Sequence, residues 1–268
     1  MRKILIIVFV FFLKTFNSSA QTWEVEASVG AMGYVGDINP VKIYKVTDPA
    51  LGIAVKRNFN GTWSAGVNLL LGKIRAKDSD SDSEYQRLRN LSFYSPITEV
   101  STLVEFNFLN YIPGIRYTIE HHKITPFLFI GIGGVFFSPR ASYNGAEYDL
   151  QTYRTESAEY PLYALTIPYG AGVKYNYHSN WSLLFKIGYR TVLTDYLDDV
   201  SEHYYLPVNP SNEIATALRD RSGEVNGGVN VGVSGAQRGD LRKYDNYLFI
   251  GFGISYNFVS RKCFTFDK

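Results

Sequence analysis

Regular alternation of apolar and polar residues recurs along this chain and is the feature that most restricts its fold. In the first such segment Val25 and Val29 alternate with Glu24 and Glu26. Successive side chains of a β-strand point to opposite faces, so this pattern predicts a strand with one apolar and one polar face. Eight segments show it, some weakly: 23–33, 50–59, 63–74, 97–108, 125–137, 165–177, 181–193 and 247–258.

The first twenty residues differ from the rest of the chain. Arg2 and Lys3 precede an apolar run over 4–13, and small residues follow before Gln21. This is the pattern of a secretory signal peptide, because a transmembrane helix needs about twenty apolar residues. We therefore expect three parts: a signal peptide over 1–20, the main domain over 21–258 and a short C-terminal tail over 259–268.

Beyond the signal peptide, no apolar run reaches the roughly 18 residues that would predict a membrane-spanning helix. The chain nevertheless holds 21 Tyr and 18 Phe, which is unusual for a soluble domain. A closed barrel is the other way to cross a bilayer with every backbone group hydrogen-bonded. Asn60-Gly61 and 178–180 predict tight turns, whereas the connections after the first, third, fifth and seventh strands are long.

These features predict an all-β fold, an eight-stranded antiparallel transmembrane β-barrel with short periplasmic turns and long extracellular loops. The location expected for it is the outer membrane of the cell, with lipid around the barrel. Aromatic residues at the periplasmic strand ends predict a girdle at one membrane interface. The alternative is a soluble sandwich capped by aromatic side chains. The girdle residues are Trp23, Trp63, Trp181, Phe108, Tyr177 and Phe258.

Charged residues fall on the inner face of the predicted strands. An eight-stranded barrel is just wide enough for side chains to fill it, and buried charges need partners. We therefore expect a salt-bridged plug, which argues against a porin. Segment 125–137 is apolar on both faces and allows no assignment of its inner face. The predicted network consists of Glu24, Glu26, Lys56, Glu99, Glu105, Lys174, Lys186 and Arg190.

Metal sites are not expected from the spacing of the metal-binding residue types. The adjacent His121 and His122 would point to opposite faces of a strand. Asp78, Asp80 and Asp82 are spaced like the start of a calcium loop, but that motif needs Gly at its sixth position and Glu at its twelfth. This chain has Ser83 and Arg89 there. We expect a solvated surface loop at 78–83.

Catalysis and nucleic-acid binding are not expected either. Ser201 and His203 are hydrolase residue types without a nucleophile elbow before them, so no catalytic residue and no cofactor are predicted. The whole chain has 27 basic and 25 acidic residues. Removal of the signal peptide takes away Arg2, Lys3 and Lys14, which leaves 24 basic and 25 acidic residues. That leaves no basic field for nucleic acid. The single Cys263 has no partner within the chain for a disulfide.

Several strings of the chain resemble those of the PorG-type outer-membrane barrels of Bacteroidetes. They are YVGDINP at 34–40, RNLSF at 89–93, TPFLFIGIG at 125–133, YNG at 143–145 and TDYLDDVS at 194–201. The resemblance implies a component of the type IX secretion system, associated with a periplasmic ring of a PorK-type lipoprotein and a PorN-type partner. The loop residues singled out in these strings are Asp37, Arg89, Asn90, Asp195, Asp198 and Asp199.

Two non-catalytic functions remain open at this stage. The first is a structural or docking barrel that contacts the periplasmic ring through its short-turn side, in particular through the long turn 109–123 and the tail 259–268. The second is a surface-facing binding or adhesion barrel that uses the loop 197–245. The carboxylates of segment 194–201 are expected to fold back onto Arg89 or Arg190 and so to stabilise the extracellular opening, or mouth, of the barrel. Gly36-Asp37 and Asn144-Gly145 are predicted to form turns.

Overall fold

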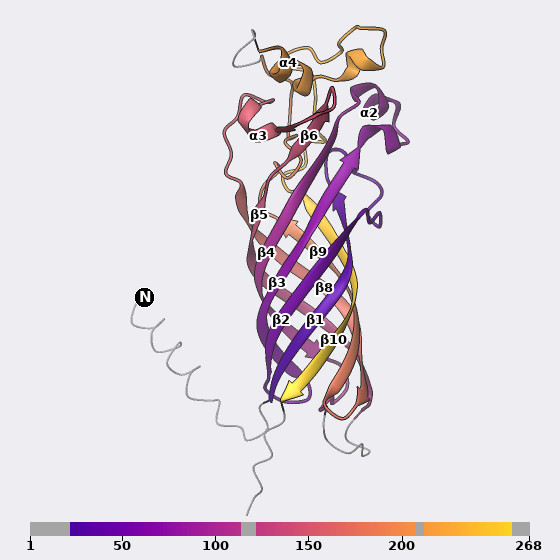
Figure 1. Ribbon diagram of the computed structural model, residues 1–268, viewed down its shortest axis with the longest axis vertical. Helices are drawn as coiled ribbons and strands as arrows, with labels where there is room; N and C mark the ends of the chain where they lie inside the picture. The colour runs from indigo at the N-terminus through magenta and orange to yellow at the C-terminus, as the bar shows by residue number, and fades with distance from the viewer. Residues whose placement is uncertain (1–21, 114–121, 207–211, 259–268) are drawn as a thin grey trace, which may run out of the picture.

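The computed structural model describes residues 22–113, 122–206 and 212–258. Its main feature is a closed antiparallel barrel in the strand order β3-β2-β1-β10-β9-β8-β5-β4, which pairing of β3 with β4 closes (Figure 1). This confirms the predicted eight-stranded barrel. The barrel strands are β1 Thr22–Val35, β2 Asp48–Asn58, β3 Trp63–Lys77, β4 Ser92–Asn107, β5 Ile124–Phe137, β8 Tyr163–His178, β9 Trp181–Val192 and β10 Asn246–Phe258.

Side chains alternate between the interior and the exterior along each barrel strand. On β1, Glu24 and Glu26 are buried, whereas Val25 and Val29 are exposed. The apolar exterior is the surface that a bilayer solvates, because lipid tails cannot hydrogen-bond to polar groups. The barrel is therefore an integral protein of the outer membrane.

Strand β5 is the segment whose facing the sequence left undetermined. In the structure Phe127 and Phe129 point into the interior. Leu128 and Ile130 point outward. Both faces of β5 are apolar, so only the register with β4, in which Phe129 lies opposite Glu105, decides which face is inside.

The two ends of the barrel differ. Short turns join β2 to β3 and β8 to β9 at the end where both ends of the described barrel, Thr22 and Phe258, also lie. We call this the periplasmic end and the opposite one the extracellular end, following the usual orientation of outer-membrane barrels. β3 and β4 extend further toward the extracellular end than the sequence predicted, because their pairing continues to Lys77 opposite Ser92.

The long loops fold into an ordered cap on the extracellular end, which we call the crown: segments 36–47, 78–91, 138–162, 193–206 and 212–245 (Figure 1). A hydrophobic core runs from the upper barrel into the crown and joins Ile74 and Phe249 to Leu150, Leu197 and Leu218. The crown elements are η1 Asp78–Asp80, α2 Glu84–Arg89, β6 Arg140–Tyr143, β7 Ala146–Asp149, α3 Leu150–Tyr153, α4 Glu213–Arg219 and η2 Ser222–Glu224.

The crown contradicts the predicted solvated loop at 78–83 and confirms the predicted turn at 144–145. The expectation of a solvated loop at 78–83 is wrong for Asp78, which is fully buried and pairs with Arg89. Asn144-Gly145 is a turn, since it joins β6 to β7 and both residues have positive φ, 49° and 80°.

No helix among the described residues is long and apolar enough to cross a membrane. Several predictions fall on other parts of the chain. The signal peptide at 1–20, the tail at 259–268 with Cys263, and most of the turn 109–123 with His121 lie outside the described residues.

Candidate functional site

A network of paired charges occupies the middle of the barrel interior. The ammonium nitrogen of Lys56 lies 3.1 Å from Glu24, 2.9 Å from Glu26 and 3.2 Å from Glu105. The ammonium group of Lys174 lies 2.5 Å from the other carboxylate oxygen of Glu105. A third lysine, Lys186, reaches Glu26 at 2.5 Å, so three carboxylates and three ammonium groups are linked.

A separate ion pair lies above this network. Arg190 on β9 reaches Glu99 on β4 at 3.2 Å, and the hydroxyl of Tyr247 donates to the same carboxylate at 2.5 Å. The ring of Phe249 lies 5.3 Å from the Arg190 guanidinium, within cation–π range. All eight predicted network residues are thus buried and paired, with four charges of each sign. Side chains, rather than a water-filled channel, occupy this part of the lumen.

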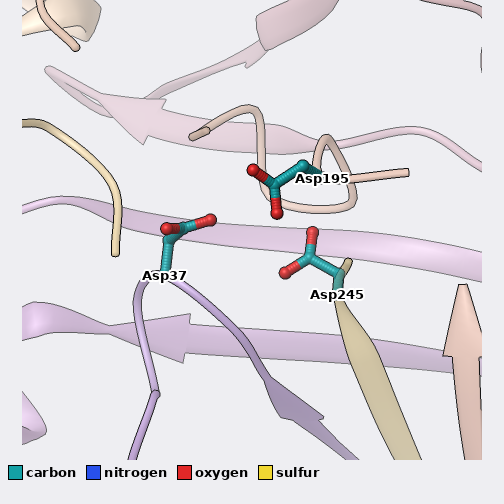
Figure 2. A group of neighbouring side chains, drawn as sticks. All are labelled: Asp37, Asp195 and Asp245. Carbon is teal, nitrogen blue, oxygen red and sulfur yellow. The ribbon is translucent and has the colours of Figure 1, made fainter. Parts of the chain in front are cut away.

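At the extracellular opening of the barrel, four carboxylates from three separate segments converge: Asp37, Asp195, Asp198 and Asp245, here called the mouth cluster. Asp37 lies in the loop after β1, Asp195 and Asp198 follow β9, and Asp245 directly precedes β10. β1, β9 and β10 are neighbours in the barrel, which brings these distant positions together. Asp37, Asp195 and Asp245 each place one oxygen within 4.8 Å of the other two, and Figure 2 shows their carboxylates facing one another.

Tyr34 ties the cluster to the end of β1. Its hydroxyl oxygen lies 2.6 Å from Asp198 Oδ2 and 2.6 Å from Asp245 Oδ1. A tyrosine hydroxyl has one hydrogen, so it donates to one of these carboxylates at a time. The second short contact requires a proton on the other carboxylate. Gly36 permits this approach, because a Cβ there would lie 1.9 Å from Asp245 Oδ1.

The mouth cluster gathers four acidic groups without a basic partner in the described part of the chain. Among the described residues, no lysine or arginine forms an ion pair with any of its four carboxylates. Burial raises the pKa of Asp195 to about 6 and the pKa of Asp37 and Asp245 further above the ordinary value. The neighbouring carboxylates raise these pKa values as well.

Two buried arginines brace the crown beside the cluster. Arg89 holds Asp78 with two hydrogen bonds of 2.7 Å and also donates to the backbone oxygen of Asp37 at 3.0 Å. Arg238 pairs with Glu156 at 2.8 Å and donates to the backbone oxygen of Asp199 at 2.8 Å. These contacts fix the loops that carry the cluster.

The predicted partners of segment 194–201 were wrong. Arg89 and Arg190 are taken by Asp78 and Glu99, and Asp198 instead accepts from Tyr34. Asp199 accepts hydrogen bonds from Thr155 and, at 2.6 Å, from Tyr160. The segment does brace the mouth, but through hydroxyl groups rather than through the arginines that the sequence suggested.

Other predicted positions have separate roles. Asn90 ends α2 in the left-handed conformation with φ 58°, a position that Asn tolerates well. Its amide nitrogen lies 3.3 Å from the backbone oxygen of Arg221.

Ser201 donates to Asp195 at 2.8 Å, and His203 lies half-exposed beside Glu202. Ser201 and His203 are therefore not arranged as a nucleophile and its base.

The predicted girdle residues all project outward near the periplasmic end. Trp23 pairs with Phe258 across β1 and β10, and Trp181 lies opposite Tyr256. The Trp63 ring contacts Phe106 edge-on at 4.9 Å. Rings from neighbouring strands thus form one band, as expected at a membrane interface. The outward girdle residues are Trp23, Trp63, Trp181, Phe108, Tyr177 and Phe258.

Sequence reasoning missed several residues of these sites. Tyr34 stands in the quoted string 34–40 but was not singled out, and Asp245 was used only as a loop boundary. Its position directly before β10, next to the end of β9 in the barrel, is the signal that could have found it. Arg238 and Glu156 gave no signal, because they lie in long loops whose folding depends on contacts between loops.

A closed eight-stranded barrel with an apolar exterior and a filled, charged interior defines the class of outer-membrane β-barrels. The family described as Domain of unknown function (DUF6089) matches residues 2–219. That is more than half of the chain, which therefore belongs to this family. Comparison with curated proteins gave no match.

Solved barrel structures are similar in fold. Ail, the attachment invasion locus protein of Yersinia pestis, in complex with the heparin analogue sucrose octasulfate, is 12% identical with a TM-score of 0.40, over 89% of this chain and 99% of that one. OprG of Pseudomonas aeruginosa is 8% identical with a TM-score of 0.46, over 90% and 97%. A major outer membrane protein from Thermus thermophilus is 15% identical with a TM-score of 0.43, over 89% and 100%.

Proposed function

We propose that this protein is a non-catalytic, non-conducting barrel that holds a partner protein at the outer membrane. The observation that carries the proposal is the filled interior, where Lys56, Lys174 and Lys186 are each paired with buried glutamates. Because side chains fill the lumen, solute passage through it is disfavoured. The surfaces left for function are the two ends of the barrel.

The particular role that we propose is docking of a periplasmic secretion ring. The resemblance of strings such as 34–40 and 194–201 to PorG-type barrels supports it, and it implies a PorK-type lipoprotein and a PorN-type protein of the type IX system as partners. The long turn 109–123 is the periplasmic connection with the most chain for such a contact. Its described part is fixed to the barrel, since Tyr111 donates to Ser182 in the interior at 2.6 Å.

The test is affinity purification of the full chain from native membranes, followed by mass spectrometry. One variant replaces 114–121 with a glycine-serine segment of equal length and keeps Tyr111. A matched control replaces 226–233 in the crown with the same segment. We expect ring lipoproteins with the parent and the control and a clear loss with the turn variant. Failure to recover them with the parent, under conditions that keep the ring intact, would reject the docking role.

The second candidate is a surface-facing binding or adhesion barrel that acts through the loop 197–245. The observation in its favour is that apolar side chains of this loop project from an ordered crown, an arrangement common at interaction surfaces. The side chains that are more than half exposed are Leu206, Val225, Val229, Val233 and Leu241.

The same two variants separate the two functions. If adhesion is the function, replacement of 226–233 abolishes binding of cells to surfaces or to host material, and replacement of 114–121 has no effect on it. If docking is the function, replacement of 114–121 abolishes secretion and replacement of 226–233 has no effect on it. Both variants must show the heat-dependent gel shift of a folded barrel for the comparison to count.

A further inference from the structure

The mouth cluster is a buried group of acidic side chains with which no lysine or arginine of the described residues forms an ion pair. Asp37, Asp195 and Asp245 face one another across a small space (Figure 2). Asp37 and Asp245 are almost completely buried and Asp195 is partly buried. Buried charges are costly, and they persist in proteins where they are paired or where they bind a metal.

The three carboxylate oxygens lie close enough together to bind a single cation. Three oxygens that all lie within 4.8 Å of one another can surround a single ion at oxygen distances of about 2.3–2.6 Å, which are those of Ca²⁺. Mg²⁺ would require distances of about 2.0–2.1 Å and a stricter octahedral geometry. Ca²⁺, whose coordination geometry is more flexible, is the ion that three carboxylates from different loops accommodate more readily.

A second observation is independent of the number of acidic residues. Asp37 is 1% exposed, and its Oδ2 atom has no hydrogen-bond partner. Its other oxygen accepts from the backbone nitrogen of Asp240, so the carboxylate is held in place while Oδ2 has no donor. Oδ1 of Asp195 is likewise buried without a partner. Buried carboxylate oxygens without a donor are the atoms that a cation would coordinate.

The surroundings hold these carboxylates in position. Asp245 accepts from the backbone nitrogen of Leu197 at 3.0 Å as well as contacting Tyr34. Asp195 accepts from Ser201 at 2.8 Å. Such hydrogen bonds fix ligand orientation, as the outer partners of metal ligands commonly do.

We propose that Asp37, Asp195 and Asp245 form a Ca²⁺ site that joins the loops of the crown to the barrel mouth. The ion would join three places in the chain, the start of the first long loop and both ends of the last one. It lies at the end of the barrel opposite the proposed periplasmic contact, so the site does not depend on the docking role.

The test measures binding of Ca²⁺ alone to the folded full chain in detergent, by isothermal titration after treatment with chelator. Tb³⁺ luminescence excited through tyrosine gives a second readout, because Tyr34 contacts Asp245 directly. We expect one Ca²⁺ per chain with a Kd below about 1 mM, the range of extracellular calcium modules. Absence of saturable binding at that concentration would overturn the proposal.

Two isosteric variants and a control make the test specific. Asp37→Asn and Asp245→Asn should each weaken Ca²⁺ binding at least about tenfold. In the parent Ca²⁺ should also make the crown more resistant to protease, and both variants should lose this response. A purely structural role for these aspartates predicts no calcium effect on protease resistance in the parent.

The matched control is the double variant Asp80→Asn with Asp82→Asn. It removes two exposed crown carboxylates that have calcium-loop spacing and that pair with Lys45 and Lys42. We expect it to bind Ca²⁺ like the parent. If it loses binding while Asp37→Asn and Asp245→Asn retain it, the site lies in that loop and the proposal is wrong.

Discussion

The ammonium group of Lys174 on β8 lies 2.5 Å from the carboxylate of Glu105 on β4, inside the barrel and across the intervening strand β5. Glu105 also pairs with Lys56 on β2, so one carboxylate links the two sides of the interior. Such a link contributes to stability only while every charge of the network keeps its partner.

Glu105→Gln should therefore destabilise the barrel by about 3–5 kcal/mol, the cost typical of breaking a buried ion pair by removal of one partner. The substitution leaves two glutamates against three lysines in the linked network. Urea unfolding in lipid vesicles measures the change. The exposed Asp82→Asn serves as the control and should lie within about 0.5 kcal/mol of the parent. Equal midpoints for Glu105→Gln and the parent would show that the network is not stabilising.

Fluorescence depth measurements check the aromatic girdle. The three tryptophans of the chain, Trp23, Trp63 and Trp181, all project outward near the periplasmic end. Lipids brominated near the headgroup should quench their emission more strongly than lipids brominated at the end of the acyl chain, because tryptophan prefers the interface. Stronger quenching by the deep label would contradict the position of the membrane assigned here.

Gly36→Ala should disrupt the mouth without unfolding the barrel. A Cβ at Gly36 would lie 1.9 Å from Asp245 Oδ1 and 2.1 Å from the hydroxyl oxygen of Tyr34, so these groups must separate. We expect faster proteolysis of the loop 197–245 and an unchanged heat-dependent gel shift. Gly134→Ala is the control, since nothing lies within 4 Å of a Cβ there. Unchanged proteolysis of the Gly36 variant would contradict the tight contact.

The crown should lose stability as the pH rises from about 4 to about 6, in part through Asp199. Burial raises the pKa of Asp199 to about 6, and Glu156 adds to this, while Arg238, Thr155 and Tyr160 act in the opposite direction. The folded crown then holds a proton that the unfolded chain, with a pKa near 3.9, releases earlier. Stability from this group is complete below about pH 4 and lost above about pH 6.

Asp199→Asn isolates this contribution, because Asn does not titrate and can exchange hydrogen bonds with Thr155 and Tyr160. Protease resistance of the variant relative to the parent should rise between pH 4 and pH 7. The mouth cluster titrates in both proteins, so the comparison removes its effect. A difference that does not change with pH would mean that Asp199 is already ionised in the folded crown at pH 4.

The sequence by itself determined the number of barrel strands, their order along the chain and most of their facing. Period-two alternation is a local property, which indicates a strand with one apolar and one polar face. Burial of Glu24 and Glu99 could be read from their position in that alternation. The facing of β5 could not, because both of its faces are apolar and only its register with β4 selects one.

Only the tertiary structure decided what the charged loop residues contact. The loop carboxylates were expected to meet Arg89 or Arg190, but Asp78 and Glu99 occupy those arginines. Asp37 and Asp245 lie far apart in the chain and meet because β1 and β10 pair. The reason is physical. Strand facing follows from neighbouring residues, whereas the partners of a loop side chain depend on how separate loops pack over the closed barrel.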